Sequence, residues 1–105
     1  MTLDDVFAKM PVAFVPDAAD GVEATVQFSC SRPRHAVIHD RTIEIRDGIA
    51  ADPTVSIIMA DDDLLALLTG ELNGMTAFLT GKLQLEGDIM FAQRMGMLFD
   101  YSRVA

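Results

Sequence analysis

The spacing of the apolar residues changes near residue 60, and this change constrains the fold more than any other feature of the sequence. Between residues 23 and 48, apolar and polar residues alternate, which is typical of half-buried strands. From Asp61 onward, apolar residues recur with a helical period, which is typical of helices that bury one side. Strands gathered in the first half and helices mainly in the second predict an α+β layer fold.

A short helix is expected at the start of the chain. Thr2 can serve as its N-cap, and Asp5 stands at the third following position, where a capping box needs an acceptor. We expect this helix to end before Pro11, because proline lacks the backbone donor that a helix needs. Residues 11–21 are then expected to form a surface connector that holds Phe14 inward.

Four strands are expected next, over residues 23–30, 35–40, 41–48 and 55–59. The first three would form a meander. In the first strand, alternation places Phe28 and Cys30 on the inward face and Gln27 on the opposite face. The last of the four is nearly continuously apolar and β-branched, which predicts a strand that is covered on both faces.

The rest of the chain is expected to hold three helices and a fifth strand. The acidic residues 61–63 suit the positive start of a leucine-rich helix. A shorter helix is expected within residues 74–81, and the strand within residues 82–87. Asp88 can then cap a final helix that reaches about Tyr101.

This final helix is apolar on two sides. The side expected to face the core carries Phe91, Ala92, Met95, Leu98 and Phe99. A second apolar patch carries Met90, Met97 and Tyr101. A helix with two apolar sides has two partners. One would be the sheet, and the other a ligand, a second subunit or the leucine-rich helix.

Length and charge exclude several classes of protein. At 105 residues, the chain is expected to form one domain over residues 1–105. Its formal net charge of −8 opposes nucleic acid as a partner and permits at most transient membrane contact. The chain begins with acids where a signal peptide has bases, and it has no apolar run long enough to span a membrane. We therefore expect a soluble, cytoplasmic protein.

The sequence contains no recognised catalytic or metal-binding motif. The candidates for a nucleophile, a base and an orienting acid are Cys30, His35, His39 and Asp40. Cys30 is expected to be a small buried residue rather than a reactive thiolate, and the histidines lack the spacing of a zinc site. Gly81-Lys82 is no phosphate loop, because Thr76 and Leu83 stand where that motif needs a glycine and a serine or threonine. We expect no enzyme activity, no metal and no cofactor.

One long segment carries a family resemblance. Its features are an Asp-Pro before a β-rich run, an acidic start to a leucine helix, Gly70, Ala77-Phe78, Gly81-Lys82-Leu83 and Gly87-Asp88. In this order and spacing, the segment ADPTVSIIMADDDLLALLTGELNGMTAFLTGKLQLEGDIMFAQRM resembles the sterol carrier protein type-2 family of non-specific lipid-transfer domains. The resemblance implies a five-stranded, mostly antiparallel sheet covered by helices, with an apolar cavity for fatty acids, acyl-CoA, sterols or other lipids. The ending YSRVA lacks the peroxisomal terminus of animal members, which fits a bacterial cytosolic protein.

Methionines in the second half of the chain favour such a cavity. Met59, Met75, Met90, Met95 and Met97 have unbranched thioether side chains, which adapt to ligands of variable shape but also fill ordinary cores. The residues expected to line the cavity are Leu64, Leu68, Phe78, Met90, Met95, Met97 and Leu98. The expected function is non-catalytic binding and transfer of a fatty acid, an acyl-CoA or an isoprenoid-type lipid. An accessory module that presents a hydrophobic intermediate, such as a quinone precursor, to a partner enzyme is the alternative, and a homodimer also stays open.

Overall fold

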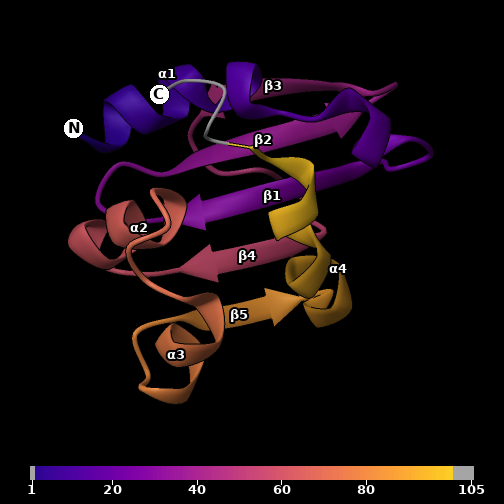
Figure 1. The fold of residues 1–105 in the computed structure, drawn as a ribbon. Coiled ribbons are helices and arrows are strands. Elements are labelled where there is room, and N and C mark those ends of the chain that lie inside the picture. The colour runs from indigo at the N-terminus through magenta and orange to yellow at the C-terminus, as the bar shows by residue number, and fades with distance from the viewer. Residues whose placement is uncertain (1, 101–105) are drawn as a thin grey trace.

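The computed structural model describes residues 2–100 and contains a five-stranded sheet with helices on one face (Figure 1). The helices are α1 (Leu3–Ala13), α2 (Asp61–Leu68), α3 (Gly74–Leu79) and α4 (Ile89–Arg94), with 3₁₀ turns η1 (Pro16–Ala19) and η2 (Met95–Leu98). The strands are β1 (Ala24–Ser29), β2 (Arg34–His39), β3 (Thr42–Asp47), β4 (Val55–Ile58) and β5 (Gln84–Gly87). Their order is β3-β2-β1-β4-β5, and all neighbours are antiparallel except β1 and β4. The predicted α+β fold with a mostly antiparallel sheet is confirmed.

The parallel pairing of β1 with β4 requires the chain to cross the sheet after β3. Because β3 lies on the far side of β2, residues 48–54 pass over β2 and β1 to reach the start of β4. Gln27 holds this crossing, since its Oε1 accepts a hydrogen bond from the Ala50 N–H at 2.8 Å. Its Nε2 donates to the carbonyl oxygens of Arg34 at 3.2 Å and Gly48 at 3.4 Å. Gln27 is therefore only 2% exposed, whereas alternation predicted a residue on the outer face of a half-buried strand.

The core lies between the sheet and the helices. Phe7 of α1 packs edge-on against Phe28 of β1, with ring centroids 5.2 Å apart. Phe28 is buried on this face, as predicted, beside Val26, and Cys30, also predicted inward, is half-buried against the core. Ile43 and Ile45 of the edge strand β3 are half-buried on the same face, as the alternation there predicts.

Strand β4 differs from its prediction. Val55 and Ile57 are buried on the helix-covered face, but Ser56 and Ile58 on the other face are only half-buried. The strand is therefore fully covered on one face and not on both, because the helices lie on one side of the sheet (Figure 1). A nearly continuous apolar run did not distinguish these two arrangements.

The predicted start of α1 is confirmed and its predicted end is wrong. Thr2 and Asp5 form both hydrogen bonds of a capping box, at 3.0 and 3.2 Å. The helix then continues through Pro11 to Ala13. Proline removes one backbone donor from the helix, but Met10 and Ala13 are completely buried. Burial of this last turn outweighs the missing hydrogen bond.

The helices and the strand predicted after residue 60 are present as α2, α3, β5 and α4. Asn73 caps α3, because its side-chain oxygen accepts hydrogen bonds from the N–H groups of Met75 at 2.8 Å and Thr76 at 3.2 Å. Asp88 caps α4 as predicted, and it accepts from the Phe91 N–H at 2.9 Å. Across residues 2–100, none of the helices is long and apolar enough to cross a membrane.

The final helix is shorter than predicted. α4 ends at Arg94, and the chain continues as the 3₁₀ turn η2 only to Leu98. Phe99 then forms an antiparallel bridge with Phe14, which needs the extended backbone found there, with φ of −131°. A helix that ran through Phe99 would lose this pairing. Tyr101, which the prediction included, lies outside the described residues.

Candidate functional site

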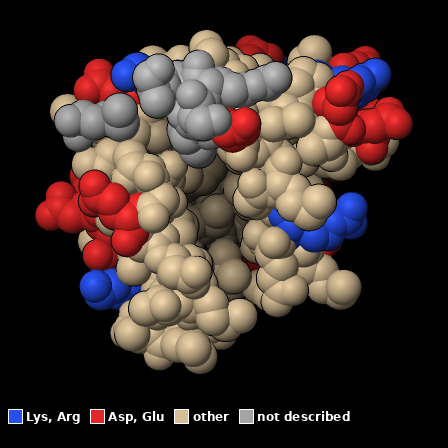
Figure 2. Space-filling model, in the orientation of Figure 1, with Lys and Arg blue, Asp and Glu red and all other residues tan. Residues whose placement is uncertain are grey.

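A cavity of about 710 Å³ lies between the helix-covered face of the sheet and the helices α2, α3 and α4. Figure 2 shows it as the hollow in the middle of the view, with mostly uncharged surface around it. The residues that line it are Met10, Phe28, Ile57, Leu67, Leu68, Thr69, Gly70, Gly74, Met75, Phe78, Leu83, Leu85, Ile89, Ala92, Gln93, Met95, Gly96 and Phe99. The sheet forms its floor, and the helices form its walls.

The chemistry of this lining suits an apolar ligand. Among the described residues that line the cavity, none is a lysine, arginine, histidine, aspartate or glutamate. Thr69 and Gln93 supply the polar side chains of the lining, and the Thr69 hydroxyl already donates to the Leu65 carbonyl oxygen at 2.8 Å. The cavity can therefore hold a molecule through burial of apolar surface rather than through charge.

The seven residues expected to line the cavity fall into three groups. Leu68, Phe78 and Met95 are part of the lining. Leu64 and Leu98 are buried in the core and do not line the cavity. Met90 and Met97 are 75% and 73% exposed and lie outside the lining, so the second apolar patch of the final helix faces outward.

Sequence reasoning missed most of the cavity wall. The sheet contributes Phe28 and Leu85, which alternation marked only as inward residues, and Ile57, which belonged to a run predicted to be covered on both faces. A cavity wall and a filled core have the same alternation, so nothing in these strands distinguishes the two. Leu67 and Met75 lie within a few residues of Gly70 and Gly74, which also line the cavity.

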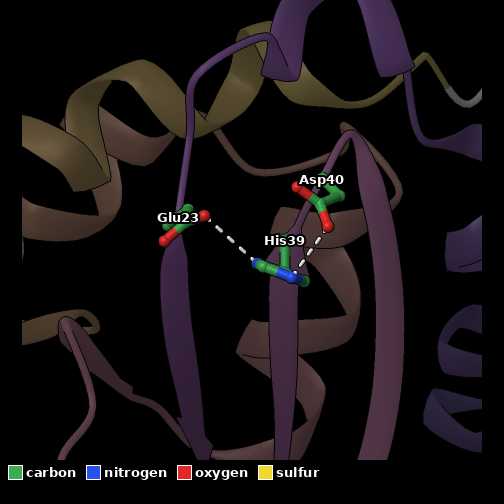
Figure 3. A group of neighbouring side chains, drawn as sticks. All are labelled: Glu23, His39 and Asp40. Carbon is green, nitrogen blue, oxygen red and sulfur yellow. Dashed lines mark ion pairs between the residues drawn. The ribbon is translucent and has the colours of Figure 1, made fainter.

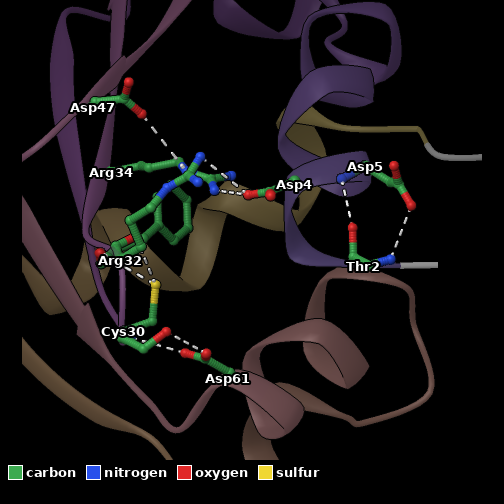
Figure 4. Close-up of polar contacts among 10 residues, drawn as sticks. Thr2, Asp4, Asp5, Cys30, Arg32, Arg34, Asp47 and Asp61 are labelled. Atoms are coloured by element: carbon green, nitrogen blue, oxygen red, sulfur yellow. Dashed lines mark hydrogen bonds and ion pairs between the residues drawn. The ribbon is translucent and has the colours of Figure 1, made fainter.

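The candidate catalytic residues lie away from the cavity. Cys30 is half-buried rather than buried at the end of β1, with its Sγ 3.4 Å from the Arg32 carbonyl oxygen (Figure 4). Desolvation by burial raises the pKa of the Cys30 thiol. The ring Nδ1 of His35 is 3.1 Å from the Gly48 carbonyl oxygen on the face that the loop crosses. Neither side chain lines the cavity.

Glu23, His39 and Asp40 form an exposed cluster at the end of the β2–β3 hairpin (Figure 3). The two ring nitrogens of His39 lie 3.2 Å from a Glu23 oxygen and 2.9 Å from an Asp40 oxygen. Both nitrogens thus already have carboxylate partners, and all three side chains are exposed. We interpret this cluster as surface contacts between an imidazole and two carboxylates.

A second polar cluster joins α1 to the sheet (Figure 4). The guanidinium of Arg34 lies 4.6 Å from the centre of the Phe7 ring and pairs with Asp4, and its Nε is 3.9 Å from Asp47. Because Arg34 is almost fully buried, these carboxylates and the ring are what stabilise its charge. The cluster borders a smaller cavity of about 340 Å³, in which Arg32 and Arg34 pair with Asp4 and Asp61 accepts hydrogen bonds from Ser31, which indicates a structural role.

The start of α2 is fixed to the end of β1 in the same region. Asp61 accepts hydrogen bonds from the Ser31 hydroxyl and, at 2.9 Å, from the Ser31 N–H. These hydrogen bonds lower the pKa of Asp61 below its ordinary value. The contact orients α2, which carries Leu67 and Leu68 on the cavity wall.

Known proteins resemble this chain in sequence and in fold. Sterol carrier protein 2 of Gallus gallus is 41% identical over 81 residues, which are 77% of this chain and 13% of that protein. The sec-alkylsulfatase Pisa1 from Pseudomonas sp. has a TM-score of 0.82 at 20% identity, over 95% of this chain and 16% of the sulfatase chain. The UbiJ-SCP2 ubiquinone synthesis protein has a TM-score of 0.66 at 14% identity, over 90% of this chain and 86% of that chain. At these identities, the two structures show a shared fold alone.

The family match covers the elements that form the cavity. It spans residues 8–100 and so includes β1, β4, β5 and the helices α2, α3 and α4. The chain spans only 13% of the length of the chicken protein, so the match concerns this domain and not the rest of that protein. With residues 8–100 matching its model, the chain belongs to the SCP-2 sterol transfer family.

Proposed function

We propose that this protein binds one long apolar lipid in the cavity, holds it without a covalent bond and releases it unchanged. The observation that carries the proposal is a cavity of about 710 Å³ with an almost entirely apolar lining, a size within the ordinary range of small-molecule sites. Burial of each lipid methylene contributes about 0.8 kcal/mol, so a chain of about a dozen methylenes needs no polar anchor. Fatty acids, acyl-CoA and isoprenoid-type lipids have such chains, and family membership supports a lipid as the ligand.

The test is to fill the cavity by mutation. Ala92 lines the cavity on α4, whereas Ala8 is exposed on α1 and lies outside the lining. Wild-type protein should bind a fluorescent long-chain fatty acid saturably and near one-to-one. Ala92→Trp should weaken binding at least about tenfold, because the indole occupies the volume that the lipid needs. Ala8→Trp, the matched control, should bind like the wild type.

Two outcomes of this titration would contradict the proposal. Folded wild-type protein that shows no saturable binding would exclude a lipid carrier. Tight binding by a folded Ala92→Trp variant would place the ligand somewhere other than the cavity. Lipids that co-purify with the protein, extracted and identified by mass spectrometry, would then identify the natural ligand class.

The alternative function is an accessory module that presents a hydrophobic intermediate to a partner enzyme. The fold shared with the UbiJ-SCP2 ubiquinone synthesis protein supports this alternative. The two functions differ in what the purified protein can do alone. A free carrier moves a labelled lipid between two vesicle populations without any other protein, whereas an accessory module binds the lipid but needs its partner for transfer.

A further inference from the structure

On the basis of the proposed lipid-binding function, we propose that Gln93 positions the polar end of the ligand at the cavity mouth, and that this polar end is an uncharged hydroxyl or carbonyl group. Gln93 and Thr69 supply the polar side chains of the described lining. The Thr69 hydroxyl donates its hydrogen to the Leu65 carbonyl oxygen at 2.8 Å. The Gln93 amide forms no hydrogen bond with another residue in the range 2–100, so its N–H groups and its oxygen are available to a ligand.

Gln93 lies where the cavity opens to solvent. It is on α4, four residues after Ile89, so the two side chains are neighbours on one side of the helix. Both residues line the cavity and both are exposed, which places them at its boundary with solvent. Met10 and Phe28 also line the cavity but are almost completely buried, so they form its deep part. A lipid whose apolar chain reaches the deep part has its polar end at the mouth, where Gln93 lies.

The cavity offers no cation to an ionised polar end. Among the described residues that line it, none is a lysine, arginine or histidine. The charged residues directly beside lining residues in the chain are Lys9, Glu71, Lys82, Glu86, Asp88, Arg94 and Asp100. All of them are exposed, the acids outnumber the bases, and the whole chain has a formal net charge of −8. Because exposed ion pairs contribute little, a carboxylate at the mouth gains no net attraction there.

An uncharged polar end can enter the mouth, whereas a carboxylate has to stay in water. A hydroxyl or carbonyl group that leaves water loses hydrogen bonds, and a hydrogen bond with Gln93 replaces one of them. The amide oxygen can accept from a hydroxyl, and the amide N–H groups can donate to a carbonyl. An ionised carboxylate has a much larger desolvation cost without a paired cation, so it remains outside and keeps the adjoining methylenes in water. The cavity therefore favours the uncharged lipid.

Titration calorimetry with dodecanol and with laurate at neutral pH tests this preference, because the two ligands have the same number of carbon atoms. Wild-type protein should bind dodecanol more tightly than laurate. Gln93→Leu should weaken dodecanol binding by about fivefold, the loss of one hydrogen bond, and leave laurate binding unchanged. Gln93→Lys should tighten laurate binding by about tenfold, because a hydrogen bond to a cation is stronger than one to a neutral amide.

Gln84 provides the matched control. It is exposed on β5 and lies outside the cavity lining. Gln84→Leu and Gln84→Lys make the same changes of polarity and charge, and both variants should bind the two ligands like the wild type. Tighter binding of laurate than of dodecanol by wild-type protein would overturn the inference. So would an equal gain in laurate binding for Gln84→Lys and Gln93→Lys, because the net charge of the chain would then set the affinity.

The same titrations separate the role of Gln93 from the proposed function. Folded wild-type protein that binds neither dodecanol nor laurate would contradict lipid binding itself. Saturable binding of both ligands that Gln93→Leu leaves unchanged would retain lipid binding and overturn the role of Gln93. Loss of dodecanol affinity in Gln93→Leu alone, with normal laurate binding, would support a polar end held at the mouth by this amide.

Discussion

Gly87 is a residue at which the sheet leaves no room for a side chain. It lies opposite Val55 in the pairing of β5 with β4, with φ of +96°. A Cβ atom there would be 2.5 Å from the Thr54 carbonyl oxygen, which also accepts the hydrogen bond of the Asp88 N–H at 2.9 Å. The glycine therefore allows β5 to end and α4 to begin beside β4.

Gly87→Ala should lower the free energy of unfolding by about 2 to 4 kcal/mol, from backbone strain and a steric clash together. Gly48→Ala is the control, because Gly48 has a similar φ of +92° but open space around its Cα. This control should lose only the cost of strain, about 1 to 2 kcal/mol. Urea denaturation of both variants measures the difference. Equal losses would show that the contact with Thr54 relaxes at no cost.

Cys30 should be a slow nucleophile. Desolvation raises the pKa of its thiol, so the thiolate fraction at neutral pH is smaller than that of a free cysteine. Its reaction with a disulfide reagent should therefore be slower in the folded protein than in the urea-unfolded protein, and it should accelerate as the pH rises. A folded-state rate above the unfolded one would indicate an activated thiolate and reopen the question of catalysis.

At the scale of elements, η2 carries two methionines with opposite surroundings. Met95 is buried and lines the cavity, whereas Met97 is exposed. Met95→Glu places a carboxylate among apolar groups and should lower the free energy of unfolding by about 3 kcal/mol. Met97→Glu should change it by no more than about 0.5 kcal/mol. Thermal and urea melts compare the two, and equal destabilisation would mean that η2 is buried all round.

Elements whose signals lie within a few residues could be predicted from the sequence. The caps formed by Thr2 and Asp88 depend on donors three positions away, and the acidic start of α2 depends on the residues that follow it. The crossing held by Gln27 could not be predicted, because it joins β1 to a loop more than twenty residues later. Pro11 was misjudged because burial of the next turn depends on the sheet, which local propensity does not describe.

The candidate site could be predicted only in part, because its lining also depends on contacts between elements that are distant in sequence. Helical spacing gives the angle between side chains of one helix, but not the direction in which the sheet and the cavity lie. Leu64 and Leu68 were therefore grouped together, although Leu68 lies at the cavity wall and Leu64 in the core. Met90 and Met97 were predicted to line the cavity, whereas both are exposed and lie outside its lining.

At the scale of the whole molecule, the cavity links parts of the chain that are distant in sequence. Its lining comes from α1, β1, β4, β5 and all three helices of the second half. A bound lipid would therefore contact the sheet and the helices opposite it at the same time. Because the unfolded chain has no such cavity, binding would favour the folded state of the entire domain.

A saturating lipid should therefore raise the melting temperature. A ligand present at about a hundred times its dissociation constant stabilises the folded state by about 2.7 kcal/mol, which for a domain of this size is a shift on the order of 10 °C. Thermal melts with and without a long-chain fatty acid measure the shift in the wild type, in Ala92→Trp and in Ala8→Trp. The melting temperature of Ala8→Trp, the exposed control, should rise as much as that of the wild type. The melting temperature of Ala92→Trp should rise little, because the indole fills its cavity. The same shift in all three proteins would mean that the lipid stabilises the fold from the surface, and the cavity would then have no part in binding.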